Sequence, residues 1–349
     1  MLLKKYKKND LSDINKIGVI ISGLLGDILL RTPVLRALKD IYPNSKIVAI
    51  TDPIGKSVLV NNNYVDDIII IDRKKVNKFK KNINKINGIL SIRAEKLDLL
   101  VNLYNGGSSH LMVALSGAKY KLGFCQNRKE YIYNIENKCA KDRLKDEQTL
   151  NNYMISIVEP LSEKQYSLKP VFDLQNIIKK ETNKYLSDFN YDVNKIYTLN
   201  LASSKEDKIL EYKKYLYIVE YIYEKYGFLP AVISNPGQEY IQDDFINKYL
   251  QNTSIPFITL KAMSIEEVAA IINITKFIVT PDTGLMHLAM AFENYIYTIF
   301  TYTHPIFVDP NNEKFISVYE HFDKEKLYQH QSISDKTIEK KIDSMFSKL

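Results

Sequence analysis

The sequence predicts an α/β protein built from two tandem, doubly wound domains. Along both halves of the chain, short apolar runs alternate with amphipathic segments, which is typical of parallel strands covered by helices on both faces. The alternation stops at a polar stretch, residues 161–169, between Pro160 and Pro170, and then begins again. The length of 349 residues suits two domains better than one core. Tandem domains of this kind would place a ligand in the cleft between them.

The first half contains the elements of one such domain, which we assign to residues 1–165. Strands are expected at residues 17–22, 46–50, 67–71 and 97–103, and helices at 28–42, 74–86 and 108–116. The helix at 74–86 is basic and carries Val76, Phe79, Ile83 and Ile86 on one face. Packing of this stripe on the sheet is the favoured interpretation, and docking on a membrane surface or a phosphorylated glycolipid is the alternative.

The second half, residues 166–349, repeats the pattern. Strands are expected at residues 196–201, 231–234, 257–260, 277–280 and 296–300, and helices at 210–226, 239–250 and 264–273. A capping box, Ser264-Ile265-Glu266-Glu267, marks the start of the last of these helices. The stripe Tyr215, Val219, Ile222 and Tyr226 is interpreted as core packing. The final helix of the chain is expected to pack either within this domain or back on the first domain.

Composition places the chain among globular proteins of a reducing cytoplasm. It is 45% hydrophobic and 26% charged. Cys125 and Cys139 cannot build a disulfide framework, and neither has metal-ligand spacing to a histidine. The lysine-rich start resembles an export signal, but Asp10 and Asp13 interrupt it and no cleavage site follows, so a buried strand is expected there. No segment reaches the roughly 18 uncharged apolar residues that span a bilayer.

The net charge of +7 favours anionic partners. Anionic small molecules, phosphorylated glycolipids and a membrane surface all suit such a balance. The basic residues are spread along the chain, and no helix-turn-helix, zinc-finger or RNA-binding motif occurs. Nucleic acid is therefore not expected as a partner.

The stretch TPDTGLMHLA, residues 280–289, is the most informative in the chain. It follows a predicted apolar strand and opens a predicted helix that continues to Phe292. A strand that turns sharply into a helix offers backbone N–H groups and the positive end of the helix dipole to a phosphate. Asp282 and Thr283 are good capping residues, Gly284 allows close approach to the backbone, and His287 lies about one turn in. The alternative is an ordinary capped connection in which His287 is merely packed.

Two further polar segments follow strands in the first half. The turn SGLLGD, residues 22–27, lacks the spacing of a dinucleotide-binding or Walker motif. Its Asp27 is either a helix cap or a general base that takes a proton from an acceptor hydroxyl, and spacing leaves both open. The segment NGGSSH, residues 105–110, is expected to be a flexible loop at the presumed cleft. Its acceptor-site candidates are Asn105, Gly106, Ser108 and His110.

Four blocks of the sequence, taken together, carry a family resemblance. Gly26-Asp27-Ile28-Leu29, with TPVLRAL at residues 32–38, resembles the N-terminal motif of the ADP-heptose:lipopolysaccharide heptosyltransferases, glycosyltransferase family 9. Residues 97–103 and 115–124 resemble that family's middle motifs. Asp282-Thr283-Gly284 with His287-Leu288-Ala289 resembles its C-terminal donor motif. The blocks keep the family's order and cover most of the chain up to about Pro310.

The resemblance implies a GT-B fold, in which two Rossmann-like domains bind acceptor and nucleotide sugar respectively. It also implies inverting, metal-independent transfer, with Asp27 as the catalytic base and Gly26 and Arg31 beside it in the acceptor site. The helix start at Asp282, Thr283 and Gly284 would stabilise the leaving diphosphate in place of a metal, and His287 would contact the donor. No cofactor is expected, and the chain has no DxD metal triplet.

Two motifs depart from the family pattern. The family's usual Asn-Pro-Gly-like phosphate loop and its lysine are replaced by Asn200-Leu201-Ala202-Ser203-Ser204-Lys205, so Ser203, Ser204 and either Lys205 or Lys208 are expected to hold phosphate. The usual Gly-Pro-Thr after the last strand is replaced by TYTHP at residues 301–305. Glu239 matches the place of a ribose-binding acid, with a surface helix residue as the alternative.

The sequence thus predicts a cytoplasmic, monomeric glycosyltransferase peripheral to the inner membrane. Its expected partners are a nucleotide sugar, with ADP-heptose as the expected donor, and a lipopolysaccharide or lipid A core acceptor. The rival functions are another GT-B enzyme, such as a nucleotide-sugar epimerase, a family member that binds nucleotide sugar without catalysis, and a two-domain binding protein of the periplasmic type. The last would need an export signal and gives Asp27 no chemical role.

Overall fold

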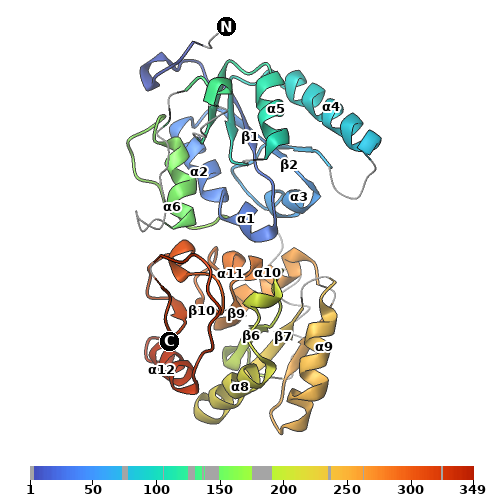
Figure 1. Ribbon diagram of the computed structural model, residues 1–349, viewed down its shortest axis with the longest axis vertical. Coiled ribbons are helices and arrows are strands. Elements are labelled where there is room, and N and C mark those ends of the chain that lie inside the picture. The colour runs from blue at the N-terminus through green and yellow to red at the C-terminus, as the bar shows by residue number, and fades with distance from the viewer. Residues whose placement is uncertain are drawn as a thin grey trace. The chain divides into compact units, whose positions relative to one another are not determined.

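The computed structural model contains two compact units, Met1–Asp173 and Leu174–Leu349. It describes residues 4–72, 78–104, 106–124, 130–135, 137, 149–174, 191–234, 237–261, 263–323 and 325–349. In each unit a parallel sheet is packed with helices (Figure 1). The predicted α/β class is therefore confirmed.

Unit 1 is built on a sheet of five parallel strands in the order β3-β2-β1-β4-β5. The strands are β1 (Lys16–Ile20), β2 (Lys46–Thr51), β3 (Asp67–Ile70), β4 (Leu99–Asn102) and β5 (Tyr120–Gly123). Its helices are α1 (Leu25–Leu29), α2 (Thr32–Ile41), α3 (Pro53–Leu59), α4 (Lys78–Ala94), α5 (Gly107–Leu115) and α6 (Leu150–Ile155). Apart from Lys16 at the start of β1, the residues of the central strands β1 and β4 are buried, and their apolar side chains belong to the core because both faces of a parallel sheet are covered.

Unit 2 is built on a sheet of six parallel strands in the order β11-β10-β9-β6-β7-β8. The strands are β6 (Ile196–Asn200), β7 (Leu229–Ile233), β8 (Ile258–Leu260), β9 (Phe277–Pro281), β10 (Tyr295–Ile299) and β11 (Phe315–Val318). Its helices are α8 (Tyr212–Tyr226), α9 (Glu239–Lys248), α10 (Ile265–Ile274), α11 (Gly284–Ala289) and α12 (Asp335–Phe346). Counted within the unit, this is the strand order of a dinucleotide-binding fold.

The predicted helix at residues 28–42 is wrong as a single element, because the structure divides it into α1 and α2. Pro33 has no N–H to continue the hydrogen-bond ladder, so it is tolerated only in the first turn of a new helix. Thr32 Oγ1 donates to the carbonyl of Leu29 at 2.7 Å and closes the break. Arg31 lies at this break, as the N-cap residue of α2.

The basic helix of unit 1 is described as Lys78–Ala94 and so ends later than predicted, while the predicted start at residues 74–77 lies outside the described residues. It packs on the core through Ile89 and Ile92, while Ile83 and Ile86 are exposed. The expectation that these two residues pack on the sheet is therefore wrong, because the buried face of α4 lies further along the helix. Val76 and the side chain of Phe79 lie outside the described residues.

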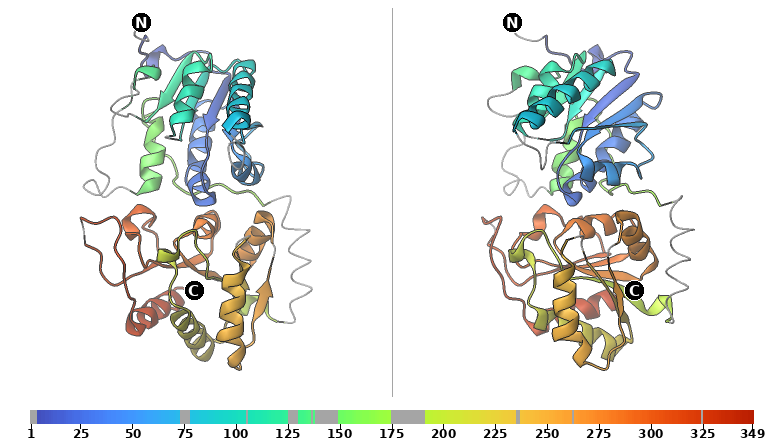
Figure 2. Two further views of the ribbon diagram at one scale, coloured as in Figure 1. Left: turned by 45° about the vertical axis from the view of Figure 1, so that its right-hand side comes forward. Right: turned by 90° about the vertical axis from the view of Figure 1, so that its right-hand side faces the viewer.

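Helix α12 packs within unit 2, against α8 and the edge of the sheet. Acidic residues at every fourth position of α12 face α8: Asp335 pairs with Lys214, Glu339 accepts from Tyr217, and Asp343 accepts from Lys225 and from two tyrosines. Figure 2 shows α8 and α9 running alongside the unit 2 sheet. The predicted core stripe of α8 is confirmed for Tyr215, Val219 and Ile222, which are fully buried.

Among the described residues, no helix is both long enough and apolar enough to cross a membrane.

Candidate functional site

The predicted site residues gather at the topological switch point of each sheet. In unit 1 the switch point lies between β1 and β4, and in unit 2 it lies between β6 and β9. Open α/β sheets bind ligands beyond the carboxyl ends of the strands at such a point, because the loops there diverge and leave a crevice. The turn at residues 22–27 follows β1, residues 104–110 follow β4, residues 201–208 follow β6, and residues 282–287 follow β9.

The turn after β1 holds Asp27 in one orientation. Asp27 is the third residue of α1, and its Oδ2 accepts from the backbone N–H of Leu24 at 3.2 Å. Gly23 has φ of +146°, and a Cβ on it would lie 2.8 Å from the Cβ of Asp27. The position therefore requires glycine. The carboxylate is partly exposed, and its Oδ1 makes no hydrogen bond with a described residue. Asp27 thus closes the capping box of α1 through one oxygen.

Arg31 lies over the same turn. Its guanidinium folds back so that Nη1 donates to the carbonyl of Ser22 at 2.8 Å. Burial lowers the pKa of this guanidinium, and the nearby Asp27 and Tyr104 oppose that effect. Arginine remains charged even so. The loop therefore presents a fixed positive group beside a carboxylate, and Gly26 is buried beneath them.

The segment after β4 leads into α5, which begins at Gly107, one residue before the predicted helix and within the loop expected at residues 105–110. Gly106 is the N-cap of α5, so Ser108 and His110 lie in the first turns of this helix, and Asn105 lies outside the described residues. His110 is buried, with Nδ1 3.0 Å from the carbonyl oxygen of Gly106. Its neighbour Ser109 donates to the carbonyls of Tyr104 and Gly106. The helix predicted at residues 108–116 is therefore close to the structure, and the expected loop is wrong for residues 107–110.

Two buried asparagines hold the loops at the switch points. In unit 1, Asn102 at the end of β4 donates to Tyr133 Oη at 2.8 Å and accepts from the N–H of Tyr104. In unit 2, Asn200 at the end of β6 donates to Thr280 Oγ1 at 2.9 Å and accepts from the N–H of Ala202. Each asparagine fixes the first residues after its strand, because an unpaired amide buried there would be costly.

The closest contact in the unit 2 switch point is an ion pair between Lys208 and Asp282. Lys208 Nζ lies 2.5 Å from Asp282 Oδ2, and both side chains are largely buried. Ser203 Oγ donates to the carbonyl of Asp282 at 3.3 Å, and the amide of Gln238 donates to the carbonyl of Ser203 at 2.9 Å. The segments after β6, β7 and β9 are thereby joined around one lysine.

Helix α11 begins directly after this ion pair. Thr283 is its N-cap in extended conformation, but no side-chain capping bond forms, and the carboxylate of Asp282 is directed to Lys208. The expectation that Asp282 or Thr283 caps the helix by its side chain is therefore wrong. Gly284 is partly exposed at the first turn, and His287 is buried in the next. The helix ends at Ala289, before the predicted Phe292.

Comparison with known proteins identifies the family of the chain. The model of the family described as glycosyltransferase family 9 (heptosyltransferase) matches residues 89–338. The chain belongs to glycosyltransferase family 9.

Individual relatives agree with this assignment. Lipopolysaccharide heptosyltransferase 3 of Escherichia coli is 22% identical over 289 residues, which cover 82% of this chain and 83% of the relative. The structure of E. coli ADP-heptose lps heptosyltransferase II has a TM-score of 0.75 at 15% identity, covering 95% of this chain and 99% of that one. E. coli heptosyltransferase WaaC with ADP-2-deoxy-2-fluoro heptose has a TM-score of 0.64 at 17% identity, covering 86% and 92%. The structural matches show a shared fold, and the family shows that the chain is a glycosyltransferase.

The remaining donor-site candidates of this family 9 member take no part in the ion pair between Lys208 and Asp282. Ser204 and Lys205 are exposed, and Lys205 Nζ lies 5.7 Å above the ring of Tyr328. The sequence left Lys205 and Lys208 as alternatives, and the structure brings only Lys208 to Asp282. Glu239 is the first residue of α9, and its carboxylate accepts from the N–H of Gly237 at 3.1 Å.

Sequence reasoning missed the residues that support the site. Asp52 at the end of β2 is buried, caps α3 through Gly55 at 3.0 Å and accepts from the N–H of Gly23 at 3.4 Å. Asn102, Asn200 and Gln238 were also missed. An Asp before Pro53 was a visible capping signal, but nothing in the sequence shows that its second oxygen reaches the turn after β1.

Proposed function

We propose that this family 9 member transfers a heptose from ADP-heptose to a lipopolysaccharide core acceptor, with inversion and without a metal ion. One observation carries the proposal: each switch point holds the type of group that one half of the reaction needs. A carboxylate with an available oxygen follows β1, and a buried lysine held by a carboxylate joins the segments after β6 and β9. The first suits an acceptor hydroxyl and the second a diphosphate.

In this scheme Asp27 is the general base. Its Oδ1 takes the proton of the acceptor hydroxyl as that oxygen attacks the anomeric carbon of the donor. Because Oδ2 is held by Leu24, the carboxylate does not need to be reoriented before proton transfer. Gly26, Arg31, Ser108 and His110 are proposed to contact the acceptor, and Arg31 suits an anionic group on it. Asn105 lies outside the described residues, and its proposed contact with the acceptor depends on the sequence alone.

Unit 2 is proposed to hold the donor and its leaving group. The bond between the anomeric carbon and the diphosphate oxygen breaks, and the electron pair leaves with ADP. Lys208 has three N–H donors, of which Asp282 uses one, so two remain for phosphate oxygens. Ser203, Ser204, Thr283 and the backbone at Gly284 complete the proposed diphosphate contacts. Fixed donors of this kind stabilise the charge that develops on the leaving group without a metal.

The family and its relatives support the proposed donor. Residues 89–338 match the heptosyltransferase family, and one structural relative holds an ADP-heptose analogue. His287, buried one turn into α11, is proposed to contact the donor sugar or diphosphate. Glu239, at the start of α9, is proposed to accept from the ribose hydroxyls.

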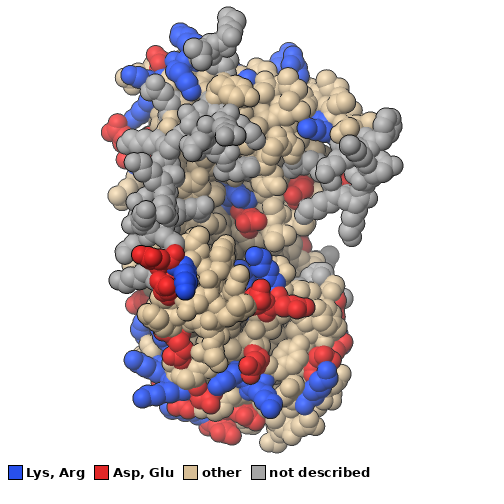
Figure 3. Space-filling view, in the orientation of Figure 1, with Lys and Arg blue, Asp and Glu red and all other residues tan. Residues whose placement is uncertain are grey.

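The acceptor's location in a membrane is supported by a surface of unit 1. Ile83, Ile86 and Leu90 form one exposed stripe on α4, Leu111 and Leu115 lie exposed on the neighbouring α5, and all five are 40% to 58% exposed. Arg93 of α4 is also exposed. In unit 2, acidic and basic side chains are interspersed over the lower part of the face that Figure 3 shows. We propose that this aliphatic surface lets a monomeric enzyme dock on the cytoplasmic face of the inner membrane.

The proposal is tested by nucleotide release from a panel of ADP-, UDP- and GDP-sugars, with and without a truncated core acceptor. Release of ADP from ADP-heptose only when acceptor is present is the expected result. Product formation without acceptor would indicate an epimerase-like activity. Tight binding of ADP-heptose without turnover, in the presence of a set of core acceptors, would indicate a binding protein and would overturn the assignment of Asp27.

A further inference from the structure

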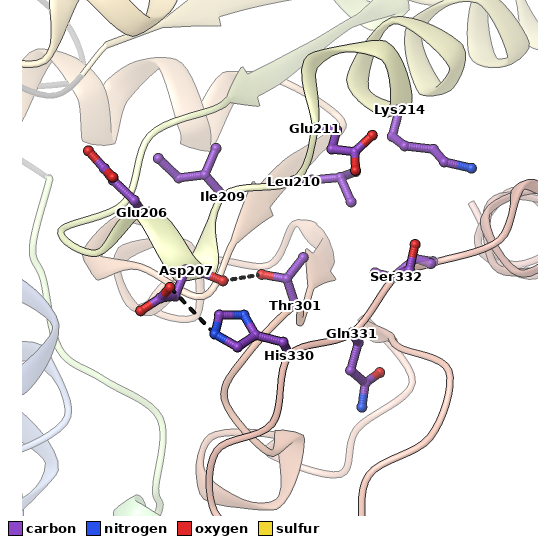
Figure 4. Close-up of a pocket in the computed structure, with 11 residues that line it drawn as sticks. Glu206, Asp207, Ile209, Leu210, Glu211, Lys214, Thr301, His330, Gln331 and Ser332 are labelled. Atoms are coloured by element: carbon purple, nitrogen blue, oxygen red, sulfur yellow. Dashed lines mark hydrogen bonds and ion pairs between the residues drawn. The ribbon is translucent and has the colours of Figure 1, made fainter.

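Unit 2 contains a cavity of about 480 Å³ that the proposed donor residues do not line. It lies beside the short turn Glu206–Lys208, whose residues face different ways. Lys208 is directed to Asp282, while Glu206 and Asp207 line the cavity (Figure 4). Ser203, Asp282 and His287 are not among the lining residues. The volume falls within the range of small-molecule sites, roughly 300–1,000 Å³.

The wall of the cavity is built by the segment that follows β10. Residues 301–304 pair in antiparallel fashion with residues 327–331: the N–H of Gln331 donates to the carbonyl of Thr301, and the N–H of Gln329 to that of Tyr302, both at 2.8 Å. Thr301 Oγ1 in turn donates to the carbonyl of Asp207 at 2.8 Å. The segment that replaces the family's usual Gly-Pro-Thr therefore fixes the cavity wall to the Glu206–Lys208 turn.

The cavity has an apolar floor and a polar rim. Leu210 and Ile333 are buried at its base, with Ile209 beside them. The rim carries the carboxylates of Glu206, Asp207 and Glu211 and the hydroxyl of Ser332, among others. A pyranose ring has matching surfaces, since its C–H groups form an apolar face and its hydroxyls surround it.

Aromatic rings extend this surface beyond the rim. His330, which lines the cavity, lies 4.8 Å from the ring of Tyr302, and Tyr302 stacks on Tyr328 at 5.3 Å. Tyr328 is 51% exposed. Exposed rings of this kind offer large, rigid contact area with a polar edge, which a sugar of more than one unit could use.

The charges of the rim decide which saccharides fit. Lys214 is already paired with Asp335 at 2.6 Å, and His330 lies 3.6 Å from Asp207. Within the described part of the chain, the carboxylates of Glu206 and Glu211 have no hydrogen-bond or ion-pair partner. An excess of carboxylates repels phosphate and accepts hydrogen bonds from hydroxyl or ammonium groups.

We propose that this cavity is a saccharide subsite, distinct from the nucleotide site, that takes a neutral or amine-bearing sugar without phosphate. Asp207 and Glu211 accept hydrogen bonds from the sugar, and Leu210 and Ile333 contact its apolar face. Because Asp207 and Lys208 are neighbours in one turn, the subsite lies directly beside the proposed donor site.

The test uses the full chain labelled with ¹³C at isoleucine methyl groups, because Ile209 and Ile333 line the cavity and report on it. D-glucose, D-glucosamine, D-glycero-D-manno-heptose, glucose 6-phosphate and inorganic phosphate are titrated separately. We expect saturable shifts of both isoleucine methyl signals with at least one of the three unphosphorylated sugars. Glucose 6-phosphate should bind at least tenfold more weakly than glucose or glucosamine. Inorganic phosphate should cause no shift. Glu211→Ala and Tyr302→Ala should each weaken the sugar response at least fivefold, while ADP affinity stays unchanged as evidence of intact folding.

Asp244→Ala on α9 is the matched control, since it removes an exposed carboxylate that, within the described residues, pairs only with Lys248. It should bind sugar as the wild type does. Absence of a saturable response to all three unphosphorylated sugars, an equal response to inorganic phosphate, or full binding by Glu211→Ala would overturn the proposal. The measurement needs no turnover, so its outcome is independent of the proposed transferase reaction.

Discussion

Lys208 Nζ and Asp282 Oδ2 lie 2.5 Å apart, although 74 residues separate them in the sequence. The two residues follow β6 and β9, the neighbouring strands at the unit 2 switch point. Because both side chains are largely buried, neither charge can be removed without leaving the other uncompensated. The pair therefore holds a lysine at the place where the fold binds phosphates.

Replacement of Lys208 is expected to weaken nucleotide binding. Lys208→Met removes the only cation that the structure brings to Asp282 within the described residues. A charge-assisted contact contributes about 1.5–3 kcal/mol, so the Kd for ADP should rise roughly 10- to 150-fold by isothermal titration calorimetry. Lys205→Met is the matched control, because Lys205 is exposed beside Tyr328, and it should change the Kd less than about threefold. Equal effects of the two variants would contradict the assignment.

Asp27→Asn is expected to abolish transfer while the fold is retained. The amide oxygen can still accept from the N–H of Leu24, so the turn should keep its shape, but the group can no longer take a proton. General-base catalysis typically contributes about 10²–10⁴-fold, and kcat should fall by this factor at unchanged ADP affinity. Steady-state ADP release and titration calorimetry measure the two quantities. Turnover near that of the wild type would show that another group takes the proton.

The aliphatic surface of α4 is expected to control membrane association. Ile86→Ser and Leu90→Ser, combined, should reduce co-sedimentation with vesicles of phosphatidylglycerol and phosphatidylethanolamine at least fivefold, because each removes exposed apolar area that lipid would cover. The transfer rate on a water-soluble truncated acceptor should not change. Tyr240→Ser, at an exposed position on α9 of unit 2, is the control and should bind vesicles normally. Normal vesicle binding by the double variant would exclude this surface as the docking site.

Asp343 is expected to stabilise unit 2 through its contacts with α8. It accepts from Tyr221 at 2.9 Å, Tyr226 at 2.7 Å and Lys225 at 2.8 Å. Burial raises the pKa of Asp343, but hydrogen bonds from Lys225, Tyr226 and Tyr221 outweigh it, so the pKa lies below its ordinary value. Because the group is partly exposed, Asp343→Ala should lower the free energy of unfolding by only about 1–2 kcal/mol in urea titrations.

The same contact predicts the sign of its pH dependence. A carboxylate with a lowered pKa in the folded state contributes its stability above the pKa of the unfolded chain, about 3.9. That contribution is lost as the pH falls through the lowered folded-state pKa. The difference between wild type and Asp343→Ala should therefore be constant from neutral pH to about 5 and vanish in strong acid. A difference that grows as the pH falls would contradict this account.

Much of the fold was predictable because it depends on local pattern. The core strands of both sheets are continuous apolar runs, and the capping box at Ser264 is present as expected, with Ser264 Oγ accepting from Glu267 at 3.2 Å. The edge strands β5 and β11 were missed, since each is only four residues long and Lys121 or Ser317 interrupts its apolar run. The division of one predicted helix into α1 and α2 was also missed, although Pro33 marked it.

The sequence by itself determined the α/β class, the family resemblance and the chemical groups of the site, because strand and helix periodicity and short motifs are local properties of the chain. Tertiary structure alone decided which groups meet. It brought Lys208 rather than Lys205 to Asp282, and it joined Asp52 to Gly23, Asn102 to Tyr133 and Asn200 to Thr280. These contacts join segments that are far apart in the sequence, so they depend on strand order and register, which no local stretch of sequence specifies.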